Sequence, residues 1–231
     1  MKETFGQFVF IIITLKMLQL SSKELIVPDD GTARSLQQGF LKDQCIVLRD
    51  FVEENLMQRI IKNLNKATFF ENQHTGIKNE VFATDQTVNG ADLVLHQINI
   101  LMNNPLLFRT IEKITGCKQI LSFAGRIYRN MPGAGHHLNW HDDTIDASRL
   151  IAISINLGPE PFEGGVFEIR EKKGKTLLKS VGCGKCGDAH VFNVSDKLEH
   201  RVTETTGRVP RIAAAGWFLS ETSPLSLYHT K

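Results

Sequence analysis

Seven short runs of β-branched and aromatic residues follow one another in the second half of the chain, separated by glycine, proline and charged turns. Strands at this spacing are typical of a sandwich or a barrel. The runs are Ile120–Tyr128, Leu150–Leu157, Val166–Arg170, Leu177–Val181, His190–Val194, His200–Val202 and Ile212–Leu219. They constrain the fold more than any other feature of the sequence, and they predict a jelly-roll core.

Helical patterns precede these strands. The turn-rich residues 28–32 lead to Cys45–Phe51, which predicts a buried strand followed by a helix. Further helices are expected over residues 91–102 and from Pro105 to Gly116, because proline is favoured at the first helical position and glycine ends a helix. The apolar face of the helix after the first strand is formed by Leu56, Ile60, Ile61 and Leu64. Helices first and strands afterwards predict an α+β fold in which N-terminal helices brace the core.

The length of 231 residues is enough for one well-buried core. We expect an N-terminal extension over residues 1–34, one catalytic domain over residues 35–222 and a C-terminal tail over residues 223–231. The sequence shows no internal repeat and no low-complexity tract.

Charge and cysteine content limit the expected partners and compartment. With 27 Lys and Arg against 25 Asp and Glu, the formal charge is +2, too small for the basic field of a phosphate-binding protein. No nucleic-acid partner is therefore expected. The four cysteines are too few and too scattered for a disulfide-stapled secreted scaffold, and a cytoplasmic location is expected. They are Cys45, Cys117, Cys183 and Cys186.

An apolar N-terminal run, Phe8–Leu15, resembles a signal peptide loosely. Lys16 interrupts it early, and no small-residue cleavage site follows. The run is also shorter than the ~20 residues of a membrane span. We expect a packed or dispensable segment and no membrane partner, with secretion or anchoring as the alternative.

The segment Trp140-His-Asp-Asp143 places an imidazole and a carboxylate two positions apart. If the segment is extended, His141 and Asp143 project from the same face of a strand and can hold one metal ion. His200 supplies a third ligand from a later strand. Two histidines and one carboxylate suit non-haem Fe(II) and leave coordination positions open. Because a lone His-x-Asp is weak evidence, the surrounding motifs carry the case.

Those motifs follow a fixed order. Arg126-Ile-Tyr-Arg-Asn-Met-Pro-Gly133 precedes the His-x-Asp pair, and Glu163-Gly-Gly-Val-Phe-Glu168 and Gly187-Asp-Ala-His-Val-Phe192 follow it. His200-Arg-Val202 comes next, and Arg211 stands six residues before Trp217. In this order the motifs resemble the 2-oxoglutarate/Fe(II) dioxygenase superfamily, and most closely its prolyl-hydroxylase-like branch. The resemblance covers residues 45–219.

The resemblance implies a double-stranded β-helix that binds iron through His141, Asp143 and His200. It implies that 2-oxoglutarate and O2 are cosubstrates, with ascorbate as an optional further cofactor. Arg211 would bind the far carboxylate of 2-oxoglutarate, which suits a bidentate guanidinium, and Tyr128 and Asn156 would assist it. Relatives often carry a serine two residues after this arginine. Here that residue is Ala213, so another side chain must complete the carboxylate site.

The implied reaction hydroxylates an unactivated C–H bond and releases succinate and CO2. Related halogenases have a small residue at the position of Asp143, so this aspartate favours hydroxylation. The substrate stays open among an amino acid, a peptide or protein residue and a small metabolite, because substrate loops vary independently of the iron site. The oligomeric state is not predicted.

Other conspicuous residues are interpreted as structural. His190 lies in the Gly-Asp strand, where relatives place an ordinary side chain, so His200 is preferred as the ligand. Trp217 and Phe218 are expected in the core. Cys183-Gly-Lys-Cys186 has no second pair at zinc spacing and is interpreted as a hairpin turn.

Three alternatives stay open. A nucleic-acid demethylase of the same superfamily would show a more basic surface and an arginine-rich stretch unlike Gly207-Arg-Val-Pro-Arg211. A cupin-like isomerase or ligand-binding module could use the same jelly roll and similar ligands but would not need Arg211. A non-catalytic relative would not need an intact triad and arginine.

Overall fold

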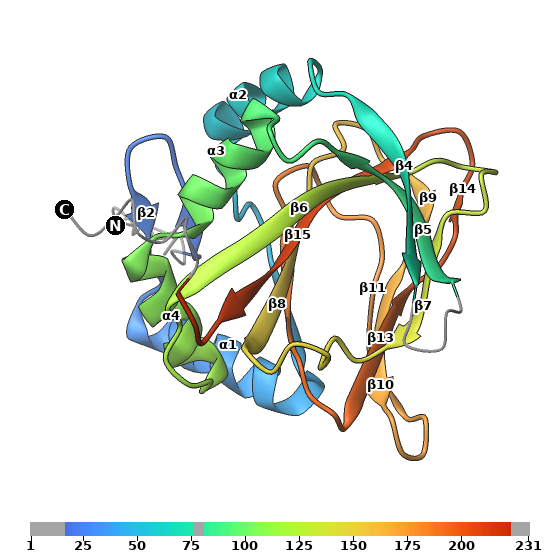
Figure 1. The fold of residues 1–231 in the computed structure, drawn as a ribbon. Helices are drawn as coiled ribbons and strands as arrows, with labels where there is room; N and C mark the ends of the chain where they lie inside the picture. The colour runs from blue at the N-terminus through green and yellow to red at the C-terminus, as the bar shows by residue number, and fades with distance from the viewer. Residues whose placement is uncertain (1–16, 76–80, 223–231) are drawn as a thin grey trace, which may run out of the picture.

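The strands of the chain form one large antiparallel sheet that bends back on itself (Figure 1). The computed structural model describes residues 17–75 and 81–222. The 11-stranded sheet has the order β11-β10-β13-β7-β5-β6-β15-β8-β12-β3, with β4 paired to β5 off this path. Its strands are β3 (Cys45–Leu48), β4 (Phe69–Thr75), β5 (Val81–Val88), β6 (Ser122–Asn130), β7 (His137–His141), β8 (Arg149–Asn156), β10 (Phe167–Glu171), β11 (Leu177–Val181), β12 (Ala189–Asn193), β13 (Leu198–Val202) and β15 (Arg211–Leu219). All seven predicted strands are present within two residues of their predicted bounds, and the α+β jelly-roll prediction is confirmed.

Two small sheets complete the strand inventory of the described residues. The pair β1 (Gln19–Leu20) and β2 (Leu25–Ile26) precedes the helices, and β9 (Glu163–Gly164) pairs with β14 (Thr205–Thr206) beside the main sheet. Leu18 and Leu20 are buried in the same apolar core as the main sheet. The chain is therefore packed on the domain well before residue 35. The apolar run Phe8–Leu15 and the tail over residues 223–231 lie outside the described residues.

Four helices cover one side of the bent sheet in the described part of the chain (Figure 1). They are α1 (Asp30–Asp43), α2 (Glu54–Leu64), α3 (Leu93–Met102) and α4 (Pro105–Thr115). The last three were predicted, and α4 begins and ends as expected, with Asn104 capping its first turn and Gly116 at φ +70° after it. The turn expected over residues 28–32 is wrong beyond Asp29. This residue caps α1 by accepting from the Thr32 amide at 2.8 Å, and the boundary placed after residue 34 falls inside that helix.

Strand alternation gives the sheet two different faces. On β15, Ala214 and Phe218 point into the apolar core under the helices, whereas Trp217 packs in a second cluster between the two layers of the sheet. The same period of two turns Ile127 of β6 toward the helices and Tyr128 toward the interior. The helix side is thus a continuous hydrophobic core, and the interior side can carry polar groups. Within the described ranges, no helix is long and apolar enough to cross a membrane.

Candidate functional site

Three predicted iron ligands meet at one point between the two layers. His141 ends β7 and His200 lies on the paired strand β13, directly across from it. His141 Nε2 lies 3.4 Å from Asp143 Oδ1, and His200 Nε2 lies 3.4 Å from Asp143 Oδ2. One ligand atom from each residue lies within 4.8 Å of the others, and no other such group was found among the described residues. The structure therefore brings the predicted triad together.

The route by which Asp143 reaches this point differs from the prediction. The segment was expected to be extended through Asp143, but β7 ends at His141, and Asp143 has a φ of +62°. The carboxylate therefore reaches the histidines from a turn in the left-handed region, and strand alternation does not place it. Arg149, on the following strand, contacts this turn through the backbone and the side chain of Asp143, both at 3.3 Å.

Burial and hydrogen bonding set the protonation of the triad. Burial raises the pKa of Asp143, but its contacts with His141 and His200 outweigh burial and hold that pKa well below the usual range. Burial lowers the pKa of His200. His141 Nδ1 donates to the Asn139 carbonyl at 2.8 Å, which directs Nε2 toward the carboxylate. An ionised aspartate and neutral histidines are the forms that bind a divalent cation.

Trp217 belongs to this site, although it was predicted to be a core residue. Its indole Nε1 donates to Asp143 Oδ2 at 2.9 Å, and the Arg149 guanidinium lies 3.9 Å from the centre of its ring. Such a donor fixes the orientation of a ligating carboxylate. Phe218, the next residue, is fully buried in the core as predicted.

Arg211 is buried on the interior face of β15 with 4% of its surface exposed. Its Nη1 donates to the Tyr128 hydroxyl at 2.9 Å and lies 3.4 Å from Asn130 Oδ1, and its Nη2 lies 3.5 Å from Ser154 Oγ. All these partners are neutral, and no carboxylate of the described residues forms an ion pair with Arg211. A buried guanidinium without a counter-charge is costly, so the site suits an anionic ligand.

The Gly-Gly motif explains how Arg211 keeps its position. Gly165 has a φ of +57°, and a Cβ atom built there would lie 2.7 Å from Arg211 Cδ. Only glycine combines this backbone with so close an approach of the arginine stem. The Gly-Asp motif is structural as well, because Asp188 accepts from the Asp50 amide at 2.8 Å and from Arg49 at 2.6 Å.

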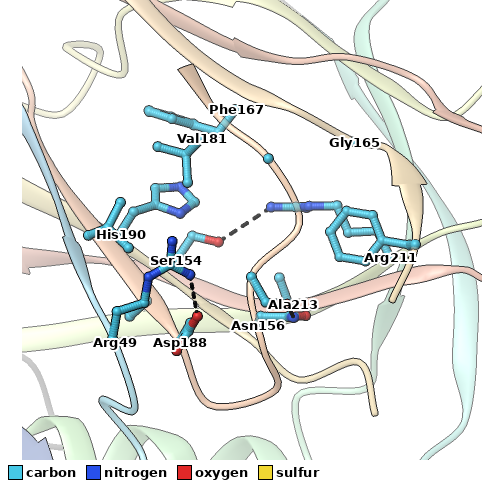
Figure 2. Close-up of a pocket in the computed structure, with 15 residues that line it drawn as sticks. Arg49, Ser154, Asn156, Gly165, Phe167, Val181, Asp188, His190, Arg211 and Ala213 are labelled. Carbon is cyan, nitrogen blue, oxygen red and sulfur yellow. Dashed lines mark hydrogen bonds and ion pairs between the residues drawn. The ribbon is translucent and has the colours of Figure 1, made fainter. Parts of the chain in front are cut away.

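Figure 2 shows the cavity beside Arg211, with Ser154, Asn156 and His190 around it. The structure does not bring Asn156 into contact with Arg211: its amide donates to the Gly184 carbonyl at 2.8 Å and accepts from the Gly158 amide at 3.1 Å. Ser154, two positions earlier on the same face of β8, lies there instead. The sequence hides this serine inside the apolar run Leu150–Leu157, and alternation from Asn156 is the one signal that could have found it.

His190 forms part of the same wall (Figure 2). Burial lowers its pKa to about 3, and its Nε2 has no hydrogen-bond partner among the described residues. Its ring contacts that of Phe167 in a tilted arrangement, with the ring centres 4.4 Å apart. The ring lies outside the group of candidate ligands, as the sequence predicted.

The two cysteines of the CxxC segment are free thiols. The hairpin interpretation of this segment is wrong, because β11 pairs with β10 whereas β12 pairs with β8 and β3. Residues 182–188 therefore connect the two layers of the sheet.

One cavity of about 920 Å³ contains the triad, Arg211 and Tyr128. A chelating dicarboxylate could therefore reach the metal ligands and the buried guanidinium from within a single pocket, whose volume is at the upper end of the range for small-molecule sites.

Comparisons with known proteins agree with this geometry. A model of the 2OG-Fe(II) oxygenase superfamily matches residues 126–219. No curated protein matches the chain by sequence. Among solved structures, a 2OG-Fe(II) oxygenase family oxidoreductase from Burkholderia pseudomallei has a TM-score of 0.63 at 12% identity, covering 89% of this chain and 97% of that one.

Two further solved structures show the range of activities on this fold. A prolyl-4-hydroxylase from Pseudomonas putida has a TM-score of 0.59 at 17% identity, covering 81% of this chain and 99% of that one. The non-haem α-ketoglutarate-dependent epimerase SnoN from nogalamycin biosynthesis has a TM-score of 0.59 at 10% identity, with 83% and 84% covered. The matched segment contains all three predicted iron ligands and Arg211. This segment is therefore similar to the 2OG-Fe(II) oxygenase superfamily, and the chain shares the fold of these solved structures.

Proposed function

We propose that this chain is a hydroxylase that holds Fe(II) through His141, Asp143 and His200 and binds 2-oxoglutarate through Arg211. One observation carries the proposal: the three ligand atoms share a single pocket with a buried guanidinium that has no counter-ion among the described residues. Neither the triad nor the buried arginine alone would indicate an oxygenase, since metal-binding jelly rolls and buried arginines both occur in proteins without oxygenase activity. Their combination matches a ligand that both chelates a metal and carries a second carboxylate.

The donor set fits Fe(II). Two imidazole nitrogens and one carboxylate oxygen form a facial triad that leaves positions open for cosubstrates. The hydrogen bond from Trp217 to Asp143 Oδ2 holds the carboxylate in place from behind. Asn139 holds His141 in the tautomer that presents Nε2. Asp143 and His141 are thus each oriented by a neighbour.

The far carboxylate of 2-oxoglutarate would pair with Arg211. Tyr128 orients the guanidinium through its hydroxyl at 2.9 Å. Ser154 stands where it could replace the hydroxyl that relatives place two residues after the arginine, since Ala213 has none. We assign these roles to Tyr128 and Ser154, and we give no such role to Asn156.

With iron and 2-oxoglutarate bound, the site would use O2 to oxidise an unactivated C–H bond, with one oxygen atom going to the substrate and the other to succinate as CO2 is released. Asp143 supports hydroxylation over halogenation, because its carboxylate occupies the position that a small residue would leave to halide. The similarity to an epimerase means that the fold alone does not decide the product. The four free thiols support the predicted cytoplasmic location.

The test is anaerobic addition of Fe(II) and then 2-oxoglutarate to the purified protein. We expect a visible absorbance band that requires both additions, is lost in His200→Ala and is retained in His190→Ala. Product masses then decide the reaction: hydroxylation adds one oxygen atom, whereas epimerisation leaves the mass unchanged. A wild-type protein that binds iron without forming the band would refute the oxygenase assignment.

A further inference from the structure

Three polar side chains form a hydrogen-bonded row in the wall of the large pocket. Arg126 on β6 lies with its Nη1 3.2 Å from His74 Nδ1 on β4. His74 Nε2 lies 3.0 Å from Asp85 Oδ2 on β5. Because a guanidinium only donates, Nδ1 accepts from Arg126, and Nε2 faces both Asp85 and, at 2.9 Å, the side-chain amide of Asn72. All three residues line the large pocket.

At both ends of this row of side chains, one group lacks a partner among the residues that the structure describes. Two other cations of the same pocket are paired, Lys172 with Asp142 and Arg149 with Asp143. No carboxylate within residues 17–75 and 81–222 forms an ion pair with Arg126.

The group at the other end of the row, Asp85, is a hydrogen-bond acceptor. Asp85 is 7% exposed, and its Oδ1 has no hydrogen-bond partner among the described residues. A buried acceptor without a partner is destabilising unless a ligand satisfies it. Among the described residues, this wall therefore presents a guanidinium without a carboxylate partner and one carboxylate oxygen, Asp85 Oδ1, without a hydrogen-bond donor.

We propose that this wall binds a free α-amino acid as the substrate, with its carboxylate on Arg126 and its ammonium group on Asp85. The inference rests on the proposed function, because the amino acid would be the molecule that is oxidised. The cation and the anion of the wall cancel, so a ligand with one charge of each sign matches it, whereas a ligand with a single charge leaves one group unpaired.

The same physics excludes the interior residue of a peptide. Such a residue has amides where a free amino acid has its two charges. Binding such a residue would cover Arg126 and Asp85 without pairing either charge. A site that binds charged or hydrogen-bonding groups strongly rejects ligands that do not have those groups. This distinguishes the chain from an enzyme that hydroxylates residues within a polypeptide.

The experiment uses the full chain loaded anaerobically with Fe(II) and 2-oxoglutarate. Equilibrium dialysis measures binding of the common L-amino acids, each compared with its α-carboxamide and its N-acetyl derivative. We expect at least one free amino acid to bind and both blocked forms to bind about 30-fold more weakly or worse, the loss typical of an unpaired buried charge. Arg126→Gln should abolish the preference for the free carboxylate, and Asp85→Asn the preference for the free ammonium group.

Matched controls separate a binding role from a structural one. Arg129→Gln removes a guanidinium from the other face of the same strand, where it contacts Phe69 and Gln86, and should bind the amino acid normally. Arg126→Lys should recover part of the affinity that Arg126→Gln loses, because it keeps the charge without the fork.

The absorbance band of iron with 2-oxoglutarate tests the two proposals separately. If wild-type protein forms the band but binds no free amino acid, or binds only blocked peptides, the amino-acid proposal is overturned and the oxygenase proposal stands. Unchanged amino-acid affinity in both Arg126→Gln and Asp85→Asn also overturns it. A missing band in wild-type protein refutes the oxygenase proposal, and the inference falls with it.

Discussion

Replacing Arg211 by methionine should leave stability nearly unchanged and sharply weaken cosubstrate binding. The guanidinium is 4% exposed and has only neutral partners, at 2.9, 3.4 and 3.5 Å. Two of these contacts are long, so their loss is offset by relief of an unpaired buried cation. We expect the free energy of unfolding of the ligand-free protein to change by no more than about 1 kcal/mol, in either direction.

Affinity for 2-oxoglutarate should fall steeply in the same variant. Truncating one partner of a buried charge pair costs about 2–5 kcal/mol, which corresponds to a roughly 30-fold to several thousandfold higher Kd. Iron affinity without cosubstrate should barely change, because Arg211 is not a ligand. Arg211→Lys should recover part of the loss, since an ammonium group keeps the charge but not the two-pronged geometry.

Anaerobic titration of 2-oxoglutarate into the iron-loaded variants measures the effect, and chemical denaturation measures stability. Arg208→Met is the matched control, because Arg208 is exposed three residues earlier in the chain. Wild-type affinity in Arg211→Met would refute the assignment. A large loss of stability without cosubstrate would refute the claim that the guanidinium is there for a ligand.

Other residues of the site give separate expectations. Asp143→Gly should stop hydroxylation, as product analysis with and without chloride would show, and undiminished hydroxylation would point to a different carboxylate ligand. Trp217→Phe removes the donor to that carboxylate and should weaken iron binding by about 10- to 100-fold. Gly165→Ala should raise the Kd for 2-oxoglutarate by displacing the Arg211 stem, which a new Cβ would meet at 2.7 Å; an unchanged Kd would contradict this. Burial lowers the pKa of His190 from its ordinary value of 6.5 to about 3. The unfolded chain therefore binds a proton at this residue as pH falls below about 6.5, whereas the folded chain does not, and the folded state is destabilised. Between pH 7 and pH 5 the free energy of unfolding should fall by about 2 kcal/mol less in His190→Phe than in wild type, as chemical denaturation at the two pH values would show.

The strands could be predicted, as could the close approach of His141, Asp143 and His200, because their signals are local or ordered along the chain. The β-branched runs after residue 119 alternate with clear turns, and the motifs from Arg126 to Trp217 follow one fixed order. Helix α4 has both a start signal, Pro105, and a stop signal, Gly116. Where several independent signals agreed, the prediction held.

The hairpin of β4 and β5 was missed for a physical reason. Its first strand, Phe69–Thr75, has exposed or half-buried residues throughout, so the sequence has no buried stripe with a period of two. This hairpin carries His74 and Asp85, and the substrate-facing wall was therefore invisible in the sequence. The backbone of Asp143 was missed because a single left-handed residue has no signature beyond the tolerance of aspartate for that region.

Small residues on β15 make the pocket possible. Ala213, Ala215 and Gly216 follow Arg211 along the strand, and a Cβ atom on Gly216 would come within 2.5 Å of β6 at the Gly125 Cα. Beneath them, on the side of the helices, the layer is fully apolar. The hydrophobic core therefore stabilises β15 from the helix side, and the opposite face of the strand can line an open pocket with polar groups.

That division explains where the chain tolerates unsatisfied polar groups. Four buried side-chain atoms of the described residues have no hydrogen-bond partner, and two of them, Asp85 Oδ1 and His190 Nε2, belong to residues that line the pocket of the triad. Arg211 adds an unpaired charge to the same pocket. Groups of this kind lower stability and persist where function requires them. Replacing them with apolar residues should therefore cost the fold little stability but prevent ligand binding, because the hydrophobic core on the helix side stabilises the fold and the pocket holds the groups that bind ligands.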